Sequence, residues 1–385
     1  MDKKISKRLL LVTYYLPSRA HGGGLRLLDL YNTIRAIDPH IVIDLLACVR
    51  TGESIDREID ELFDKVVVVM PESFNAVGIA SSGLDLASYG TVDLQYLQSG
   101  ALANLFRRHG VQRIIFSPME SMVRAASLRL QTRSRASSTT LQPSWWRMLA
   151  TAAREIWYGQ EADQTVCVSY NDARVLRNFL PSSKVTAIET GVSPIELPTA
   201  LSDPRWTREL DQVKRVVFLA YFGSDTNREA LQWYLQHVHP VVRDALPSYQ
   251  FEVVGRGLEI PRPQKDPSIH FLGPVDLVED ALRGAWVGIA PALSGAGLRG
   301  KINQYAVMKI PCVASTLAAE GLAYADHKDI YLAGDAETFA QRCITLLSTK
   351  SHNFAMGDAA RRVCLSNYVW EAKTGEISLI YDLAT

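Results

Sequence analysis

The sequence predicts an α/β protein built from two doubly wound domains, each with a parallel sheet. Its 385 residues exceed what one hydrophobic core usually serves. Short β-branched runs alternate with longer segments of helical period, which is typical of βαβ units. The alternation pauses at residues 189–210, a stretch rich in Pro, Ser, Thr and Gly that indicates a linker, and then resumes.

The first half of the chain contains four clear strand patterns and two clear helix patterns. Strands are expected at 8–15, 41–49, 65–70 and 111–118, helices at 25–37 and 145–159, and a strand running into a helix at 164–180. The polar stretch 131–144 is expected to be a mobile loop.

The second half repeats the same alternation. Strands are expected at 213–223, 249–257, 269–275, 285–293 and 311–316, and helices at 227–246, at 276–284 and twice near the C-terminus. Ligands of such sheets bind beyond the carboxyl ends of the strands, so candidate functional residues should follow strands.

Composition excludes several classes of protein. Lys plus Arg and Asp plus Glu both number 41, which argues against a general nucleic-acid binder. The five cysteines form no CxxC pair, and buried free thiols in a reducing compartment fit them best. His237 and His239 are too close in sequence to share a helix face, so no metal site is expected. No signal peptide or membrane-spanning window is found, and we expect a soluble, cytoplasmic protein.

Three consecutive glycines, Gly22, Gly23 and Gly24, follow the first strand and precede a helix. Their amides could approach an anion closely at the helix N-terminus. A flexible turn between strand and helix explains them equally well, and the sequence leaves both interpretations open.

The segment "PALSGAGLRGKINQYAV" follows a predicted buried strand and contains Gly295, Gly297 and Gly300. Arg299 and Lys301 lie where the next helix begins, and there they would oppose the helix dipole. A diphosphate between the cations and the loop amides would remove that conflict. Two solvated cations beside a turn are the less favoured alternative.

Other candidates have structural alternatives. Arg26 could reach a cleft between the domains or cap the surface. The turn "VVGRG" around Arg256 could shape a pocket for a nucleotide base or simply end a strand. Glu320 could bind a sugar hydroxyl or water. Trp145, Trp146 and Trp157 lie on one predicted helix. Packing against a sheet is a commoner role for them than an acceptor platform.

Five segments occur along the chain in this order: "LLLVTYYLPSRAHGGGLRLLDL", "VTAIETGVSP", "FEVVGRG", "VGIAPALSGAGLRGKINQYAVMKIPCVASTLAAEGL" and "YVWEAKTGEISLIYDL". In these segments and their order the chain resembles GT-B glycosyltransferases, most of all the retaining family 4 enzymes of bacterial polysaccharide and lipopolysaccharide synthesis. The resemblance implies two Rossmann-like domains facing a cleft. It implies an acceptor-side domain at 1–195, a nucleotide-sugar-binding domain at 196–367, and a C-terminal helix, 368–385, that packs back on the first domain.

The resemblance also implies site residues. Arg299 and Lys301 would stabilise the leaving diphosphate, and no metal would be needed. The expected donor-binding residues are Gly22, Gly23, Gly24, Gly223, Gly255, Arg256, Ser294, Gly295, Gly297, Gln304 and Glu320. Arg26 and His21 are expected on the acceptor side of the cleft. Transfer would go from a nucleoside-diphosphate sugar to a hydroxyl of a glycan, lipid-linked or small acceptor.

The chain departs from the family at two of these places. Ser294 stands where many members have Glu, and Gln304 stands where their Glu binds the ribose. A neutral amide makes weaker hydrogen bonds than a carboxylate. A catalytically silent GT-B scaffold that binds a nucleotide or glycan is therefore the alternative function.

Basic residues also raise the question of peripheral membrane binding, at the inner face of the membrane. Lys3, Lys4, Lys7 and Arg8 form one group and Arg124 to Arg135 a second. Both could meet anionic headgroups, although a solvated surface is the commoner explanation.

Overall fold

The computed structural model describes residues 8–19, 22–134, 143–192, 209–210, 212–257, 266–275, 278–294 and 300–383. It divides into two compact units. Unit 1 contains residues 1–190 and 373–385, and unit 2 contains residues 191–372.

Unit 1 is built on a seven-stranded sheet in the order β3-β2-β1-β4-β5-β6-β7, in which all pairs are parallel. Its strands are β1 (Arg8–Thr13), β2 (Val42–Cys48), β3 (Lys65–Val69), β4 (Thr91–Gln95), β5 (Arg113–Ser117), β6 (Gln164–Cys167) and β7 (Val185–Ala187). Its helices are α1 (Gly22–Ile37), α2 (Arg57–Leu62), α3 (Ala76–Ala80), α4 (Tyr96–Gly100), α5 (Ala103–Arg108), α6 (Met122–Ser134), α7 (Pro143–Glu161), α8 (Tyr170–Leu176) and α16 (Thr374–Tyr381).

Unit 2 has a six-stranded parallel sheet in the order β10-β9-β8-β11-β12-β13. Its strands are β8 (Lys214–Leu219), β9 (Tyr249–Val254), β10 (Ile269–Gly273), β11 (Val287–Ala290), β12 (Cys312–Ser315) and β13 (Tyr331–Ala333). Its helices are α10 (Asp225–Trp233), the π-helical η5 (Tyr234–Val238), α11 (His239–Ala245), α12 (Val278–Leu282), α13 (Gly300–Val307), α14 (Ala336–Ser348) and α15 (Lys350–Asn367).

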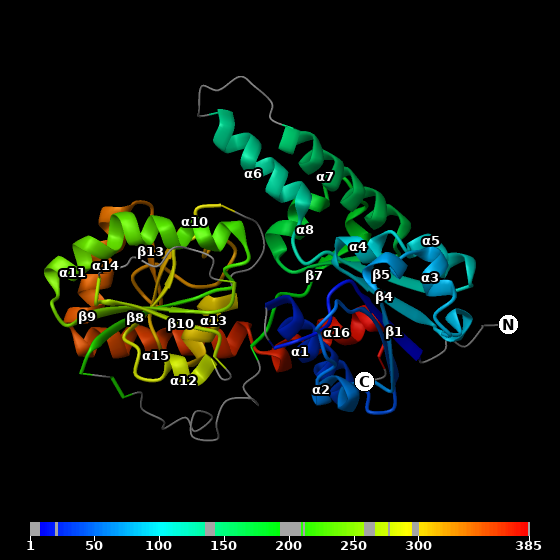
Figure 1. Cartoon of the computed structure of the whole chain (residues 1–385), viewed down its shortest axis with the longest axis horizontal. Helices are drawn as coiled ribbons and strands as arrows, with labels where there is room; N and C mark the ends of the chain where they lie inside the picture. Colours follow the sequence, from blue (N-terminus) through cyan, green and yellow to red (C-terminus); the bar gives the residue numbers. More distant parts are fainter. Residues whose placement is uncertain are drawn as a thin grey trace. The chain divides into compact units, whose positions relative to one another are not determined.

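Helices cover both faces of the unit 2 sheet (Figure 1), and buried apolar residues form a core on each face. Phe218 of β8 packs with the helices α10, α11 and α14, whereas its neighbour Val217 packs with α13 and α15 on the other face. Alternate residues of a strand point to opposite faces, so a strand covered on both sides must be apolar throughout. The continuous apolar runs in the sequence are explained by this arrangement.

Several predicted elements differ from the observed ones. Strands β4, β7 and β13 were not expected, because their runs are short and β4 carries the polar residues Asp93 and Gln95. The predicted helix at 227–246 is interrupted by the π turn η5, which precedes Pro240. Proline lacks an N–H and its ring clashes with the carbonyl four residues earlier, so the regular helix cannot continue through it.

The predicted mobile loop at 131–144 is too long. Residues 131–134 belong to α6 and residues 143–144 to α7, so helices take both ends of the segment. Residues 135–142 lie outside the described ranges, as does most of the predicted linker. All five cysteines are buried free thiols, as predicted.

Candidate functional site

In both parallel sheets the order of the strands reverses at a central pair, β1 and β4 in unit 1 and β8 and β11 in unit 2. The connections on either side of such a pair diverge and leave a crevice beyond the carboxyl ends of the strands. Each unit therefore has its own candidate ligand edge, and the two edges are described separately.

The unit 1 edge is lined by half-buried aromatic rings. Tyr14 and Tyr15 follow β1, and Tyr96 follows β4. The rings of Tyr15 and Tyr96 meet edge to face with centroids 4.9 Å apart, and the Arg50 guanidinium lies 4.8 Å from the Tyr15 ring centroid. Rings backed by a cation form a firm apolar surface beside the start of α1.

The three glycines form the first turn of α1 rather than the loop before it. A Cβ atom at Gly23 would overlap the hydroxyl of Tyr96, whereas one at Gly22 would meet nothing. Tyr96 itself has a φ of 67°, which is uncommon for a residue other than glycine. Glycine at position 23 thus allows Tyr96 to lie against the helix N-terminus, and a larger residue would displace that ring.

Arg26 lies in the second turn of α1 and is only 2% exposed. Its guanidinium donates to the Ile188 carbonyl at 2.6 Å and to Thr190 Oγ1 at 3.1 Å. Burial lowers the pKa of Arg26 to about 10. The expectation that Arg26 caps the surface is wrong, because the side chain ties α1 to the end of unit 1.

The unit 2 edge depends on a close approach between two loops. Gly255 follows β9 with a φ of 140°, and a Cβ there would overlap the carbonyl of Ala220. The Phe222 amide donates to the Arg256 carbonyl at 2.7 Å, so the loop of Gly223 lies directly against the "VVGRG" turn. The strand-end interpretation of that turn is correct, and the turn also shapes the edge before α10.

Lys301, in the first turn of α13, is half-buried at this edge. Its Nζ donates to Asn227 Oδ1 of α10 at 3.2 Å and lies 4.5 Å from the centroid of the Phe218 ring. The amide oxygen and the ring face both favour the cation, which offsets its unfavourable place at a helix N-terminus. Lys301 is therefore held at the edge rather than extended into solvent.

Ser294 lies beyond β11, and its hydroxyl donates to Glu229 Oε2 of α10 at 2.6 Å. A carboxylate is thus present beside Ser294, although it comes from another element. Gln304 is half-buried, one turn along α13 from Lys301, and Glu320 is exposed after β12. Arg299, Gly295, Gly297 and His21 lie outside the described residues.

Sequence reasoning missed Tyr96, Asn227 and Glu229. Tyr96 was missed because the strand before it was not recognised. Asn227 and Glu229 lie two residues apart on a predicted helix, where polar residues are ordinary surface positions. Their contacts to Lys301 and Ser294 depend on how α10 packs beside α13, which no local pattern signals.

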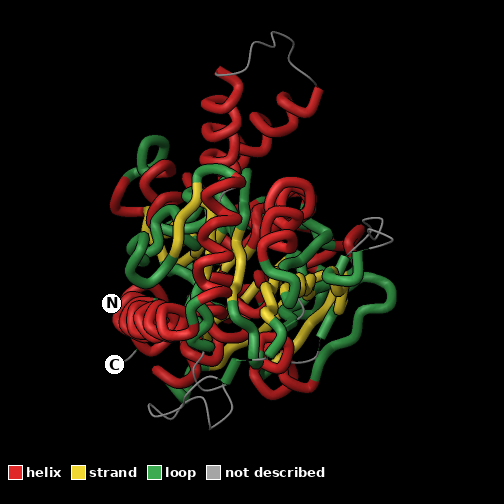
Figure 2. Tube along the Cα trace, turned by 90° about the vertical axis from the view of Figure 1, so that its left-hand side faces the viewer, coloured by secondary structure: helices red, strands yellow, loops and turns green. Residues whose placement is uncertain are grey.

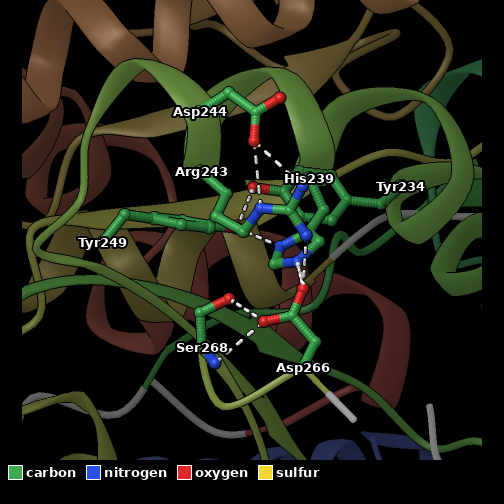
Figure 3. A network of polar contacts seen from close by, with 7 residues as sticks. All are labelled: Tyr234, His239, Arg243, Asp244, Tyr249, Asp266 and Ser268. Atoms are coloured by element: carbon green, nitrogen blue, oxygen red, sulfur yellow. Dashed lines mark hydrogen bonds and ion pairs between the residues drawn. The ribbon is translucent and has the colours of Figure 1, made fainter.

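A second polar network lies in unit 2, around His239 (Figure 3). The two ring nitrogens of His239 are 3.1 Å from Tyr249 Oη and 3.0 Å from Asp266 Oδ2. Burial lowers the pKa of His239. Burial alone would raise the pKa of Asp266, but hydrogen bonds from Ser268, His239 and Arg243 lower it below the usual range.

This network resembles a catalytic relay, but its position argues otherwise. Tyr249 is the first residue of β9, so the network lies at the amino ends of the strands, away from the ligand edge. Its bonds join α11 to the segment before β10. We assign it a structural role.

The described residues contain no group of three or more His, Cys, Asp or Glu side chains that could hold a metal ion. Within the same ranges, none of the helices is long and apolar enough to cross a membrane.

Comparisons with known proteins identify the fold and the second unit. Residues 213–349 match the family model for glycosyl transferases group 1. No curated protein matches the chain in sequence.

Solved structures resemble the chain over nearly its full length. HepE of Anabaena, in complex with UDP and glucose, aligns with 97% of this chain and 99% of its own at 12% identity and a TM-score of 0.70. Sucrose-phosphate synthase from Thermosynechococcus elongatus aligns with 97% of this chain and 98% of its own, at 13% identity and a TM-score of 0.72. The lipopolysaccharide outer core galactosyltransferase WaaB aligns with 98% of this chain and 100% of its own, at 12% identity and a TM-score of 0.64.

At these identities the structural likeness concerns the fold, and the family match concerns unit 2. Together they confirm the predicted GT-B architecture and the resemblance to group 1 glycosyltransferases. Residues 213–349 therefore match the glycosyl transferases group 1 model, and the chain as a whole has the two-unit GT-B fold of the solved glycosyltransferases that it resembles.

Proposed function

We propose that the protein transfers a sugar from a nucleoside-diphosphate sugar to a hydroxyl acceptor during synthesis of a polysaccharide, lipopolysaccharide or other glycoconjugate. The observation that carries this proposal is Lys301, held between Asn227 and Phe218 at the ligand edge of unit 2. A fixed cation at the start of a helix, beside the point where the strand order reverses, suits a diphosphate. HepE, which shares the fold, is seen with UDP and glucose.

In this proposal Lys301 and Arg299 act on the leaving group. When the glycosidic bond breaks, negative charge builds on the nucleoside diphosphate, and fixed cations stabilise it more in the transition state than before. Ser294 and Gln304 would bind donor hydroxyls, and Glu229 would orient the Ser294 hydroxyl through their 2.6 Å hydrogen bond. Gly22, Gly23 and Gly24 would present the amides of α1 to the donor.

We further propose, from the resemblance to the retaining family 4 enzymes, that the configuration of the sugar is retained. We also propose that no bound metal is needed, because the two cations can neutralise the leaving group. Arg26 is left out of the proposed set, since its guanidinium is bonded within unit 1. The five buried free thiols support a reducing, cytoplasmic compartment for the reaction.

The Lys301→Ala variant tests this proposal. We expect turnover to fall by ~100-fold or more, because the variant removes a charge that stabilises the transition state. The thermal unfolding midpoint should stay close to that of the parent. Turnover is measured as nucleoside diphosphate released from a panel of nucleotide sugars, with Lys328→Ala as a control at an exposed lysine of the same unit.

Two outcomes would contradict the assignment. Equal turnover by Lys301→Ala and Lys328→Ala would remove Lys301 from the mechanism. Calorimetric binding of a nucleoside diphosphate by the parent protein, without turnover of any donor, would favour the scaffold alternative.

A further inference from the structure

Helix α7 exposes an unusual apolar surface. It pairs with α6, and the two helices project together from unit 1 (Figures 1 and 2). Trp146 is 67% exposed, Leu149 40% and Trp157 56%. The sequence-based expectation that these tryptophans pack against a sheet is therefore wrong for Trp146 and Trp157, while the Trp145 side chain lies outside the described ones.

These side chains share one side of the helix. Trp146 and Trp157 are three turns apart, so their side chains point in nearly the same direction about 16 Å apart along the axis. Ala150 and Ala153, both exposed, lie between them. We call the surface formed by Trp146, Leu149, Ala150, Ala153 and Trp157 the α7 face.

The α7 face is not needed for the core of unit 1. The opposite side of the helix already supplies that contact, with Ala152 buried and Met148 and Ile156 partly buried against Val123 and Ala126 of α6. A helix with a buried side normally carries polar residues on the other. Large apolar side chains kept exposed in a row instead indicate a surface that binds something.

Cations outnumber carboxylates around the α7 face. Arg147 and Arg154 are exposed along its edge, and Arg129 is exposed on α6. The helix has two acidic residues: Glu155 is fully buried, and Glu161, its last residue, is half-buried one turn beyond Trp157. An approaching anionic surface would therefore meet apolar rings and exposed cations along the helix, with one half-buried carboxylate at its end.

We propose that the α7 face docks on an anionic lipid bilayer, with α7 lying in the plane of the headgroups. Tryptophan concentrates at the boundary between headgroups and acyl chains, because its ring is apolar and its N–H is polar. Each arginine near an anionic membrane adds attraction, and a helix with an apolar face edged by cations binds in the interface. This surface is independent of the proposed chemistry.

The two basic clusters found in the sequence supply fewer cations for membrane binding than the sequence suggested. Arg124 is buried and paired with Asp172 at 3.2 Å, so it cannot meet headgroups. Arg8 is paired with Asp44 at 2.6 Å. Lys3, Lys4 and Lys7 lie outside the described residues. The membrane-binding cations that the structure supports are Arg147 and Arg154.

The test is co-sedimentation of the full chain with two kinds of vesicle, phosphatidylcholine alone and phosphatidylcholine mixed with phosphatidylglycerol. We expect binding to the mixed vesicles, a blue shift of tryptophan emission, and weakening by added salt. Arg147→Glu with Arg154→Glu should lower the partition coefficient by about 30-fold or more. Trp146→Ser with Trp157→Ser should lower it and abolish most of the emission shift.

The matched control replaces two exposed apolar residues elsewhere, Val77→Ser with Leu379→Ser, which are 77% and 80% exposed. It should bind vesicles as the parent does. Failure of the parent to bind the mixed vesicles would overturn the proposal, as would equal binding by the variants. A dimer in sedimentation velocity that the tryptophan variant loses, without vesicle binding, would instead assign the face to a second copy. Donor turnover measured without vesicles separates this result from the proposed activity.

Discussion

Two glycines, Gly255 after β9 and Gly23 in the first turn of α1, are constrained by different neighbours. At Gly255 a side chain would overlap the backbone carbonyl of Ala220, and the φ of 140° is itself unfavourable for other residues. At Gly23 a side chain would overlap the end of the Tyr96 side chain, which can rotate away. One glycine therefore maintains the fold and the other maintains the position of a ring.

Replacing Gly255 by alanine should destabilise unit 2. We expect the free energy of unfolding to fall by about 3 kcal/mol or more, because the cost of the strained backbone adds to the cost of the steric overlap. Urea unfolding measures it. Gly375→Ala is the control, since that helical glycine has open space around it and should gain roughly 0.5 kcal/mol. Equal effects of the two substitutions would refute the argument.

Replacing Gly23 by alanine should affect the unit 1 edge more than stability. The new methyl group displaces Tyr96, so we expect the KM for donor or acceptor to rise while unfolding free energy changes by about 1 kcal/mol. Adding Tyr96→Phe removes the overlapping hydroxyl and should restore part of the loss. Kinetics of the single and double variants form the test, and no recovery in the double variant would contradict it.

At the scale of elements, a buried carboxyl group holds the start of α6. Glu155 of α7 accepts hydrogen bonds from the Val123 amide at 2.8 Å and the Ser121 hydroxyl at 3.3 Å. Burial, opposed by these hydrogen bonds and aided by Asp172, raises the pKa of Glu155 to about 7. The group that joins the two projecting helices thus favours its proton near neutral pH.

The raised pKa of Glu155 makes stability depend on pH in a definite direction. The folded protein binds the proton more tightly than the unfolded chain, so this contribution is fully present below pH 4.5 and lost as pH rises to about 7. Glu155→Gln stays neutral and should gain about 2 kcal/mol relative to the parent between pH 5 and pH 8. Thermal unfolding of the variant and the parent at pH 5 and at pH 8 measures this difference.

Gln160→Ala provides the control on the same helix, because it changes no titrating group. Its effect on unfolding should be the same at pH 5 and pH 8. If Glu155→Gln also shows no difference between the two values, the carboxyl group does not act as described.

At the scale of the whole molecule, the chain ends in the unit in which it begins. After Ala372 it returns to unit 1, where α16 packs beside α1. Tyr381 Oη donates to Asp93 Oδ2 at 2.7 Å, and Tyr31 and Gln95 donate to the same oxygen. Burial raises the pKa of Asp93 despite these donors. Residues from both ends of the sequence therefore satisfy one buried carboxyl group.

Removing one donor to Asp93 should weaken unit 1. We expect Tyr381→Phe to lower the free energy of unfolding by about 1.5–3 kcal/mol, because a buried acidic group loses a hydrogen bond. Leu379→Ala, at a position 80% exposed on the same helix, should change little. Urea unfolding followed by circular dichroism measures both, and comparable losses would show that the Asp93 contact is not the cause.

The sequence by itself determined the two parallel sheets and the glycine-containing segments that follow β1 and β9. Those features depend on local patterns: apolar runs that must be covered on both faces, and glycines after strands. The resemblance to glycosyltransferases also came from contiguous segments, and the family match over residues 213–349 supports it.

Only the tertiary structure decided which polar groups meet. Asn227 binds Lys301, Glu229 binds Ser294 and Tyr96 lies against Gly23, although 65 or more residues separate each pair. It also decided that Arg26 is buried while Trp146 and Trp157 are exposed. Such outcomes depend on how helices pack on a sheet and on what already covers their other side. The periodicity of a single helix predicts neither.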